Sequence, residues 1–578
     1  MSEIVIKRRE LPQQNIHLAS VKHPLLEKLY LGRGIKSAEE LNYSTQALLN
    51  YQHLSGIHLA TEVLYQGVIN NKKILIVGDF DTDGATSTAL IITALKKFGI
   101  TNVTYIIPDR FEDGYGLSTS VVNKAIEQQA ELIITVDNGI SAVEAVSFAK
   151  QANIQVIITD HHLAPDVLPN ADAIINPNLV DCAFPSKNLA GVGVTFYFML
   201  AFRALLRQQN WFQTRNLKEY NLANLLDLVA LGTVADVVKL DQNNRILVQQ
   251  GLSRIRSGYC GAGIKALISI SKKNIHELTA QDLSFYLAPR LNAAGRMENM
   301  SLGVELLLVE NEQDALELVE VLEDLNNSRK AVEKNMQQEA LSFIEQLDLQ
   351  TDTIPNGFVI YHPKFHQGVI GVLSSRIKER FYRPTISFAL AENGYLKGSG
   401  RSISGIHLRD ILERINIRDS KLIVCFGGHA MAAGLTIEQE NLALFTQYFN
   451  EEVAKVTANM TLEHVVETDG EIGDEFLNVA TAQLLKEHGP WGEGFPDPLF
   501  DGIFSVYQQK LIAQKHLKLV LQPNDGGQLV NAIMFNVDPA LWPDPSIKTV
   551  KMVYNLTVDE FRGNQSITLL VKHLWALD

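Results

Sequence analysis

Short apolar runs, each ending in polar residues, recur along the first third of this chain. They lie at residues 74–77, 103–107, 132–136, 154–159 and 173–175, with helical patterns at about 85–98, 118–130 and 141–152 between them. Short apolar strands that alternate with helices indicate βαβ units and a parallel sheet covered by helices on both faces. We therefore expect an α/β domain built on such a sheet.

The polar residues that end these runs are of a few kinds. They are mainly aspartates, histidines and asparagines: Asp79, Asp81 and Asp83, then Asp109 with Arg110, Asp137 with Asn138, Asp160 with His161 and His162, and Asn176. In an open parallel sheet, ligands bind at the carboxyl ends of the strands. The sequence therefore predicts that these side chains share one site.

The first cluster, GDFDTDG at residues 78–84, places three carboxylates on alternate residues. Carboxylates this close repel one another, and a bound cation relieves the repulsion. An EF-hand calcium loop begins in a similar way, but it needs a glutamate at its twelfth position, and Leu90 stands there. It also needs a preceding helix, whereas residues 74–77 are typical of a buried strand. The EF-hand interpretation is therefore excluded.

Carboxylates combined with imidazoles suit Mn²⁺ or Mg²⁺, and suit Zn²⁺ less well without thiolates. Several carboxylates also indicate two ions, which together promote in-line displacement at phosphorus. A further candidate ligand lies in the segment 228–236 and is Asp236. Asp227 is its rival, and spacing alone cannot choose between them.

An ordered set of short motifs extends across the chain. It comprises GDFDTDGATS at 78–87, GYG at 114–116, LAGVGV at 189–194, PRLNAAGR at 289–296, HQGVIGVLSSR at 366–376, GSGRS at 398–402 and GGHAMAAG at 427–434. Because of these motifs, the chain resembles the DHH phosphoesterase superfamily. The superfamily is named for the Asp-His-His triplet, which stands here at residues 160–162. Within it, the chain is most similar to the RecJ family of single-strand-specific 5′→3′ DNA exonucleases, over essentially its whole length.

The resemblance implies a set of metal ligands. Asp81 and Asp83 would each hold one metal, and Asp137 would bridge the pair. His161 would be a further ligand. Asp236 is similar to the last ligand of the family, so the resemblance favours it over its rival.

The resemblance also implies roles for the neighbouring residues. His162 would contact the scissile phosphate or the leaving oxygen. Asp79 would be a ligand or would orient one, and Asp160 would support the site by accepting a hydrogen bond from a histidine. Arg110 would guide the strand.

The glycine-rich motifs of the second half resemble a DHHA1-type substrate-binding domain. The resemblance implies that Arg296, Ser399 and Arg401 hold the 5′-terminal phosphate and that His429 contacts the substrate near the metals. The glycines at 398–402 would also let backbone N–H groups approach an anion. A fixed pocket for the terminal phosphate would make the enzyme an exonuclease of defined polarity.

Pattern shifts predict five parts. They are an N-terminal extension (1–51), a DHH metal-binding domain (52–300), a connecting helix (301–350), the DHHA1-type domain (351–456) and an OB-like barrel (457–578). Residues 314–347 have helical periodicity, and a connecting helix is preferred there to a coiled-coil helix. The fold class expected is α/β with a C-terminal β-barrel.

Five β-type runs in the last part predict five antiparallel strands, at 500–507, 516–521, 528–536, 548–556 and 566–573. OB folds bind single strands through aromatic stacking. Tyr507, His516 and Phe535 are candidate stacking residues, although core packing is the expected fate of each. A passage too narrow for a duplex would explain selectivity for single strands.

Composition places limits on these interpretations. The net charge of −14 counts against binding of DNA, but net charge is an average over the molecule. Part of the acidity lies at 310–324, on the expected exposed face of a helix, while basic residues gather at 376–383 and at Lys397 and Arg401. The three cysteines are interpreted as packing residues of a protein in a reducing compartment. We expect a cytoplasmic protein with no signal peptide and no membrane span.

Three functions remain in view. The preferred one is a metal-dependent 5′→3′ exonuclease that degrades single-stranded DNA to 5′-mononucleotides in DNA repair and recombination. The second is a DHH-family phosphodiesterase of short oligonucleotides, and the third is a non-catalytic, Cdc45-like scaffold. The expected cofactor is two Mn²⁺ or Mg²⁺ ions. The expected partners are single-stranded DNA, a helicase and a single-strand-binding protein, and the protein is expected to be a monomer.

Overall fold

The computed structural model describes residues 4–13, 16–110, 112–346, 355–391, 394–458, 460, 463–523, 526–539, 541–561 and 564–577. Packing divides the chain into two compact units. The smaller unit is built mainly from Glu323–Val466 together with Arg296–Glu298, and the larger from Arg8–Gly295, Asn299–Leu322 and Glu467–Asp578. The predicted boundary between residues 350 and 351 lies outside the described residues, and the five predicted domains stay a prediction.

The larger unit contains the predicted parallel sheet. Its five strands lie in the order β3-β2-β4-β5-β6, and every pairing is parallel. Their bounds are β2 Ile74–Val77, β3 Val103–Ile106, β4 Leu132–Val136, β5 Gln155–Thr159 and β6 Ala173–Ile175. The central strands β2 and β4 are buried along their whole length, as continuous apolar runs predict. All the polar clusters named above follow these strands, so they meet at one edge of the sheet.

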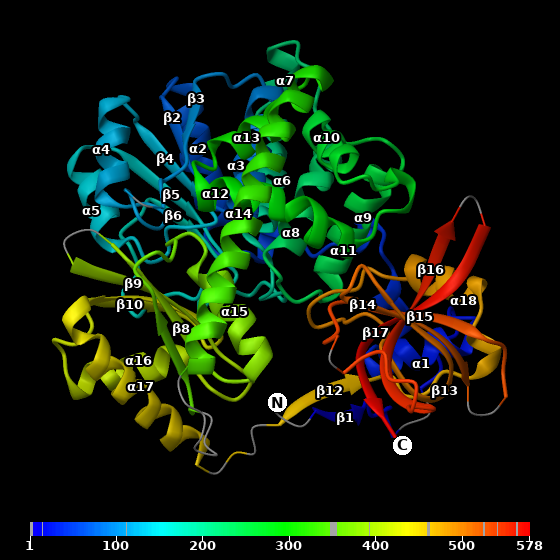
Figure 1. Ribbon diagram of the computed structural model, residues 1–578. Helices are drawn as coiled ribbons and strands as arrows, with labels where there is room; N and C mark the ends of the chain where they lie inside the picture. The colour runs from blue at the N-terminus through cyan, green and yellow to red at the C-terminus, as the bar shows by residue number, and fades with distance from the viewer. Residues whose placement is uncertain are drawn as a thin grey trace. The chain divides into compact units, whose positions relative to one another are not determined.

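Helices cover both faces of this sheet (Figure 1). The helices α4 (Thr119–Glu127) and α5 (Val143–Gln151) pack against one face in a single apolar core. The helices α3 (Thr82–Lys97) and α6 (Gly191–Gln208) contact the other face. This is the predicted layered α/β arrangement.

A helical region follows the sheet. It comprises α7 Trp211–Thr214, α8 Leu226–Ala235, α9 Gln242–Arg256, α10 Ala262–Ile270, α11 Ala280–Asp282, a π-helical turn at Leu283–Leu287, α12 Ala288–Met297 and α13 Ser301–Leu308. α8 is apolar on all sides and packs against α3, α6 and α9. It therefore lies in the interior and ends at Asp236.

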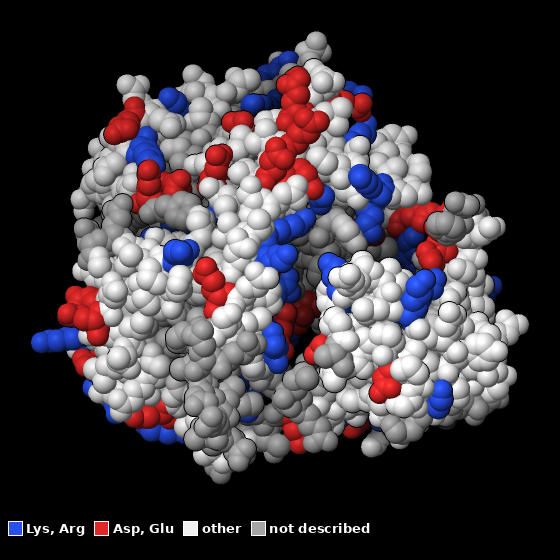
Figure 2. Space-filling view, in the orientation of Figure 1, with Lys and Arg blue, Asp and Glu red and all other residues white. Residues whose placement is uncertain are grey.

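The long helix α14 (Glu312–Gln346) contributes to both units. Its later turns bury Met336 and Ala340 in the core of the smaller unit, which favours a connecting helix over a coiled-coil helix. Its first turns expose the acidic side chains predicted there. Figure 2 shows a stripe of Asp and Glu side chains over the part of the molecule where Figure 1 draws α13 and α14.

The smaller unit contains a mixed sheet in the order β10-β11-β9-β8-β7, in which only β7 and β8 are parallel among the described pairings. Its elements are β7 Phe358–Tyr361, α15 Ile370–Phe381, β8 Thr385–Leu390, β9 Tyr395–Arg401, α16 Leu408–Arg418, β10 Cys425–Gly428, β11 Ala432–Glu438 and α17 Leu442–Thr457. This is the predicted second α/β lobe.

The glycine motif at residues 398–402 does not offer its backbone N–H groups to an anion as predicted. Its first four residues lie in β9, which pairs with a strand on each side, so their backbone groups belong to the sheet. The glycines are required by packing: a Cβ on Gly398 would lie 2.5 Å from Phe388, and one on Gly400 would lie 2.6 Å from Leu408. That part of the prediction is wrong.

The C-terminal part of the larger unit is a closed five-stranded barrel in the order β13-β14-β15-β17-β16. The strands are β13 Phe500–Ile512, β14 His516–Pro523, β15 Val530–Met534, β16 Thr549–Phe561 and β17 Asn564–Ala576. The prediction of five antiparallel strands is wrong in one pairing, because β15 and β17 are parallel. A closed ring with an odd number of strands cannot alternate direction throughout. Residues 524 and 525, between the predicted runs 516–521 and 528–536, lie outside the described residues.

Two surface expectations are also wrong. Tyr507 and Phe535 do not pack in the barrel core: their exposed fractions are 74% and 52%. Cys425 is exposed at the start of β10, whereas Cys182 is buried as predicted. Within the described part of the chain, no helix combines the length and the apolar character that crossing a bilayer requires.

The N-terminal segment packs against the part of the chain that leads into the barrel. The helix α1 (Pro24–Gly32) places Tyr30 against Trp491 and Phe495, and the phenol of Tyr30 donates a hydrogen bond to the carbonyl of His488. The strand β1 (Ile4–Arg8) pairs with β12 (His464–Thr468). The predicted N-terminal extension is therefore folded onto the last part of the chain.

Candidate metal centre

The loop between β2 and α3 carries the first three carboxylates. Asp81 caps α3, because its Oδ1 accepts a hydrogen bond from the backbone N–H of Gly84 at 3.1 Å. Asp83 lies in the first turn of α3, and its carboxylate accepts the N–H groups of Gly191 and Val192 at 2.6 and 2.9 Å. The start of α6 thereby fixes the position of Asp83.

Asp137 follows β4 in a left-handed conformation, with φ of 65°. Such a conformation is uncommon outside glycine and occurs where the surroundings hold it in place. A Cβ on Gly191 would lie 2.5 Å from Oδ1 of Asp137, so only glycine fits at the start of α6. Asp83 and Asp137 therefore meet at the same helix terminus.

The DHH triplet follows β5. Asp160 is buried, and its Oδ1 accepts the backbone N–H groups of His161 at 2.7 Å and His162 at 3.1 Å. The same oxygen lies 2.7 Å from Nδ1 of His162, and Oδ2 accepts the N–H of Ile140. Asp160 thus makes the supporting hydrogen bond predicted for it, and His162 is its partner.

The side chains converge around His161. Its Nε2 lies 3.1 Å from Asp137, 3.5 Å from Asp236 and 4.0 Å from Asp83. Three overlapping groups each bring their ligand atoms within 4.8 Å of one another: Asp137 with His161 and His162, Asp83 with His161 and Asp236, and Asp79 with Asp81 and Asp137. All eight predicted metal-cluster and catalytic residues therefore lie together.

The cluster carries strongly perturbed carboxyl groups. Burial, followed by repulsion from neighbouring aspartates, raises the pKa values of Asp83 and Asp236 to about 7. The same causes raise the pKa values of Asp79 and Asp137 well above the usual range. Such values mean that several buried negative charges are unfavourable together unless a cation is present.

The histidines of the triplet differ from each other. Burial lowers the pKa of His161 and favours the neutral imidazole, which is the form that binds metals. Burial also opposes the charge on His162, but the hydrogen bond to Asp160 outweighs it and raises its pKa to about 9. His162 therefore carries a proton at neutral pH.

Unsatisfied atoms test whether this donor set fits divalent ions. Oδ1 of Asp79, Oδ1 of Asp137 and Nε2 of His161 are buried and have no hydrogen-bond partner. A buried polar atom without a partner is costly, and coordination of a metal ion would satisfy these three atoms. The set of carboxylates with one neutral imidazole suits Mn²⁺ or Mg²⁺. The residues present fit the predicted metals.

The structure separates the two rival aspartates on α8. Asp236 ends the helix and joins the cluster, whereas Asp227 lies in the first turn. Both oxygens of Asp227 are already engaged, since they accept the N–H groups of Leu228 at 2.8 Å and Gly261 at 2.9 Å. Asp227 therefore fixes the turn before α10 and lies outside the cluster.

Arg110 lies beside the cluster. Its guanidinium carbon is 3.7 Å from the ring centroid of Phe80, and its Nε donates a hydrogen bond to the carbonyl of Gly295. Burial lowers its pKa, while Asp79 and Asp81 oppose that effect. Arg110 is thus a cation within reach of the aspartate loop.

The predicted phosphate-binding residues gather in the smaller unit, near the start of α15. Nη1 of Arg401 donates to Oγ of Ser399 at 3.2 Å, and a Cβ on Gly371 would lie within 3.0 Å of both side chains. Nη1 of Arg296 donates to the carbonyl of Gly368 at 3.4 Å. A helix start with two guanidinium groups and a hydroxyl is suited to binding a phosphate.

His429 and the predicted basic cluster at 376–383 do not lie at the start of α15 with the other predicted phosphate-binding residues. His429 lies in the hairpin between β10 and β11, where its N–H bonds to Ala432, the residue paired with Arg401. In the basic cluster, Arg376 is engaged by Glu333 at 3.0 Å and by Glu379 at 3.4 Å. Arg376 therefore stabilises the fold of this unit, and the cluster at 376–383 offers less free charge than predicted.

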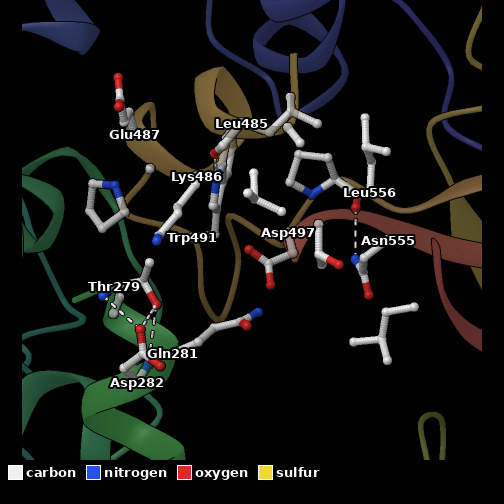
Figure 3. A pocket seen from close by; sticks show the side chains of 18 of the residues that line it. Thr279, Gln281, Asp282, Leu485, Lys486, Glu487, Trp491, Asp497, Asn555 and Leu556 are labelled. Carbon is white, nitrogen blue, oxygen red and sulfur yellow. Dashed lines mark hydrogen bonds between the residues drawn. The ribbon is translucent and has the colours of Figure 1, made fainter. Parts of the chain in front are cut away.

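A separate cavity of about 310 Å³ lies in the larger unit between the helical region and the barrel. Figure 3 shows Gln281 on one side of it and Asp497 and Asn555 on the other. Cations (Arg256, Lys273, Lys486 and Lys572) and acids (Asp282, Glu487 and Asp497) both line it. None of the metal-cluster residues does, so this cavity is distinct from the metal site.

Comparisons with known proteins place this chain in a family. Three family models match consecutive parts of the chain: "DHH family, N-terminal domain" at residues 73–233, "DHHA1 domain" at 355–455 and "RecJ OB domain" at 468–573. The single-stranded-DNA-specific exonuclease RecJ of Escherichia coli is 52% identical over 575 residues, which span 100% of both chains. This chain belongs to the RecJ family.

Other RecJ proteins agree with this assignment. The RecJ of Bacillus subtilis is 33% identical over 95% of this chain and 67% of its own. Among solved structures, RecJ of Thermus thermophilus in complex with Mn²⁺ matches with a TM-score of 0.80 and 25% identity, over 100% of this chain and 80% of that one. Its complex with Mg²⁺ matches with a TM-score of 0.76. The predicted fold class is confirmed.

Sequence reasoning placed Asn138 and Asn176 at the site without giving them a role, and it did not assign Tyr115 to the site. Asn138 donates hydrogen bonds to the carbonyls of Val77 and Val136 and so ties two strand ends together. Asn176 donates to the carbonyl of His162 and holds the triplet loop. The phenol of Tyr115 lies 3.3 Å from Nε2 of His162 and 3.4 Å from the carbonyl of Asp137. Their positions at strand ends and in the GYG motif were the available signal.

Proposed function

We propose that this chain is a metal-dependent exonuclease specific for single-stranded DNA, which acts from the 5′ end and releases 5′-mononucleotides. The observation that carries the proposal is the convergence of five aspartates and two histidines, with unsatisfied buried ligand atoms, in a chain of the RecJ family. Mn²⁺ or Mg²⁺ is the cofactor, in agreement with the Mn²⁺ and Mg²⁺ complexes of the similar Thermus thermophilus enzyme.

The metal ligands proposed are Asp81, Asp83, Asp137, His161 and Asp236, with Asp79 as a further ligand or as an orienting group. Two bound divalent ions would lower the pKa of an attacking water and stabilise the charge of an in-line displacement at phosphorus. Gly191 and Val192 hold Asp83, so the start of α6 keeps the ligands in place.

His162 would act on the substrate. Asp160 engages its Nδ1, and Nε2 lies on the opposite side of the ring, 3.3 Å from the phenol of Tyr115. A pKa of about 9 keeps this imidazole protonated at neutral pH. The proton on Nε2 can therefore stabilise the scissile phosphate or pass to the leaving 3′-oxygen of the terminal nucleotide.

A terminal-phosphate site would set the polarity. Arg296, Ser399 and Arg401 are proposed to bind the 5′-phosphate, with His429 as a further substrate contact. Cleavage between phosphorus and the 3′-oxygen of the terminal nucleotide leaves a new 5′-phosphate on the shortened strand. Each cycle would therefore regenerate the group that this site binds. Arg110 would guide the strand beside the metals.

The remaining expectations concern the setting of the reaction. Single-stranded DNA is the substrate, and the barrel matched by the "RecJ OB domain" model is proposed to bind it beyond the active site. We propose that the enzyme is a cytoplasmic monomer that works in repair and recombination with a helicase and a single-strand-binding protein. We also propose that a duplex is excluded sterically. The Cdc45-like alternative is not favoured, because every candidate ligand is present, and the oligonucleotide phosphodiesterase is not favoured, because of the barrel.

One digestion tests this function. End-labelled single-stranded DNA, double-stranded DNA and RNA are incubated with the enzyme in Mn²⁺, with and without EDTA. The expected product is mononucleotides, from single-stranded DNA only and without EDTA only, and an Asp137→Asn variant gives none. Digestion of RNA at an equal rate would favour the oligonucleotide phosphodiesterase, and binding without cleavage would favour the scaffold.

A further inference from the structure

Two aromatic side chains are exposed on the π-helical turn at Leu283–Leu287. Phe285 is 71% exposed and Tyr286 is 42% exposed, while Leu283 and Leu287 on the same turn are completely buried. A π-helical turn contains one residue more than a normal turn and often marks a functional site. Here the buried leucines fix the turn and leave the two rings in solvent.

The turn is connected directly to the aspartate loop through α12. Oδ1 of Asn292 accepts hydrogen bonds from the backbone N–H of Thr82 at 2.8 Å and from its hydroxyl at 2.9 Å. Thr82 lies between Asp81 and Asp83. Gly295 packs so closely that a Cβ there would lie 1.9 Å from the carbonyl of Phe80. Because a helix rises about 1.5 Å per residue, Phe285 lies roughly 10 Å along the axis from the aspartate loop.

Two lysines lie beside the rings, and one of them is paired with a carboxylate. Nζ of Lys273 lies 3.8 Å from the ring centroid of Tyr286 and 2.9 Å from Oδ1 of Asp282. Lys272 is exposed beside it. Exposed aromatic faces next to basic side chains are the combination by which proteins bind single-stranded nucleic acid without sequence preference.

On its other side the turn adjoins the cavity at the barrel. Lys273 and residues 279–282, which directly precede the turn, line that cavity, and the opposite wall is formed by barrel residues such as Asn555 (Figure 3). The turn therefore lies between the aspartate loop and the barrel, within the larger unit. A strand that extends from the metals to the barrel would pass these rings.

We propose that Phe285 and Tyr286 form a stacking platform for the bases of the single strand on the 3′ side of the scissile phosphate. A stacked strand advances about 3.4 Å per nucleotide, so roughly 10 Å corresponds to about the third nucleotide. Stacking is independent of sequence, because every base has a π face. The platform rests on the proposed function and extends it by naming the residues that hold the strand next to the reacting nucleotide.

The test uses the full-length protein with the double substitution Phe285→Ala and Tyr286→Ala. Tyr259→Ala is the matched control, because Tyr259 is also an exposed ring (77%). It lies near Gly261, which contacts the first turn of α8, whereas Asp236 of the metal cluster is at the other end of that helix. Strand affinity is measured in EDTA by fluorescence anisotropy with a 12-nucleotide single strand, and KM and kcat are measured in Mn²⁺. The double variant should weaken binding and raise KM by about 5- to 150-fold, with a smaller effect on kcat. The control should match the wild type, and Phe285→Trp should retain binding.

An abasic substrate separates stacking from a structural effect. Removing the bases at the third and fourth nucleotides should weaken binding to the wild type by the same factor as the double substitution, and should have no further effect on the double variant. The platform would be overturned if base removal and the double substitution each weakened binding independently, so that their factors multiplied. Wild-type affinity in the double variant would also overturn it. Failure of the proposed function would be recognised differently, as a wild type that does not cleave single strands in Mn²⁺.

Discussion

Oδ1 of Asp160 lies 2.7 Å from Nδ1 of His162, and the same oxygen accepts the backbone N–H groups of both histidines of the triplet. One buried carboxylate therefore fixes the loop and the orientation of the His162 ring, and it accepts the proton on Nδ1 in a hydrogen bond. Burial opposes the charge on both groups, but their hydrogen bond outweighs it, so the pKa of Asp160 falls and that of His162 rises to about 9.

This pair gives a prediction for pH dependence. Asp160→Asn removes the negative charge and should lower the pKa of His162 from about 9 toward its ordinary value of 6.5. The folded protein then loses the proton on His162 at a lower pH, so kcat should decline above about pH 7 instead of about pH 9. A pH–rate profile in saturating Mn²⁺ measures this shift. An unchanged alkaline limb would contradict the role of Asp160.

A second prediction separates the two aspartates of α8. Asp236→Ala should reduce cleavage by at least about 100-fold, because it removes a proposed ligand, and loss of orienting partners alone costs 10–100-fold. Asp227→Ala should instead destabilise the fold by about 1–3 kcal/mol, since the N–H groups of Leu228 and Gly261 lose their acceptors. Activity per folded molecule and thermal unfolding are measured for both variants. The reverse pattern would make Asp227 the ligand.

In the metal-free protein, the stability of the fold should increase as the pH falls through the neutral range. In the metal-free protein, the pKa values of Asp83 and Asp236 are about 7 when folded, against 3.8 for an ordinary aspartate. Their charged forms therefore destabilise the fold above pH 7, and the penalty disappears as pH falls and the folded state takes up protons. His162 acts in the same direction between pH 9 and 6.5.

The Tm in EDTA should accordingly rise as pH is lowered from 8.5 to 6.5. Saturating Mn²⁺ should flatten this slope, because the ions neutralise the carboxylates. Differential scanning fluorimetry across this range checks both statements, and Asp83→Asn should reduce the slope in EDTA. A Tm in EDTA that falls over the same interval would show that the cluster is not a destabilising set of charges.

A further prediction concerns the terminal phosphate. Arg401→Ala should reduce kcat/KM on 5′-phosphorylated strands by roughly 10- to 150-fold, since hydrogen bonds between charged groups contribute about 1.5–3 kcal/mol. Strands with a 5′-hydroxyl should be affected much less. Arg409→Ala is the matched control, because Arg409 is an exposed arginine on α16 of the same unit. An equal loss on both kinds of end would count against a phosphate pocket at Arg401.

The candidate metal site was largely predictable because all of its proposed ligands except Asp236 follow a strand of a parallel sheet. Apolar runs and helical spacing determine that sheet, and the carboxyl ends of its strands meet at one edge. The choice between Asp227 and Asp236 was different. Both are on one helix, and only packing decides which end of α8 reaches His161.

Other features depend on contacts between residues distant in the sequence, which local patterns do not encode. The glycines of residues 398–402 have the composition of an anion-binding loop, but Phe388 and Leu408 require them in the middle of a sheet. The exposure of Tyr507 and Phe535 depends on which face of the barrel each ring occupies. The parallel pairing of β15 with β17 follows from closure of the barrel.

The attachment of the N-terminal segment is the least predictable part of the fold, and it supports the last prediction. The side chain of Arg33 is completely buried, and two of its nitrogens contact the two oxygens of Asp469 at 2.9 Å each. Its Nε donates to the carbonyl of Pro496. Asp469 is also buried, and Arg33→Ala would leave its carboxylate with only the N–H of Leu499 at 3.0 Å and the more distant Arg9 at 3.6 Å, at a cost of up to about 3–5 kcal/mol.

Unfolding by urea should therefore show a marked loss of stability in Arg33→Ala. Asp469→Asn in the Arg33→Ala background should recover part of it, because the buried charge is then absent. Lys36→Ala is the matched control, as an exposed cation of the same segment. If all of these variants unfolded at the wild-type urea concentration, the ion pair would not be what holds the N-terminal segment in place. Its other contacts, such as the packing of Tyr30 on Trp491 and Phe495 and the pairing of β1 with β12, would then have to hold it.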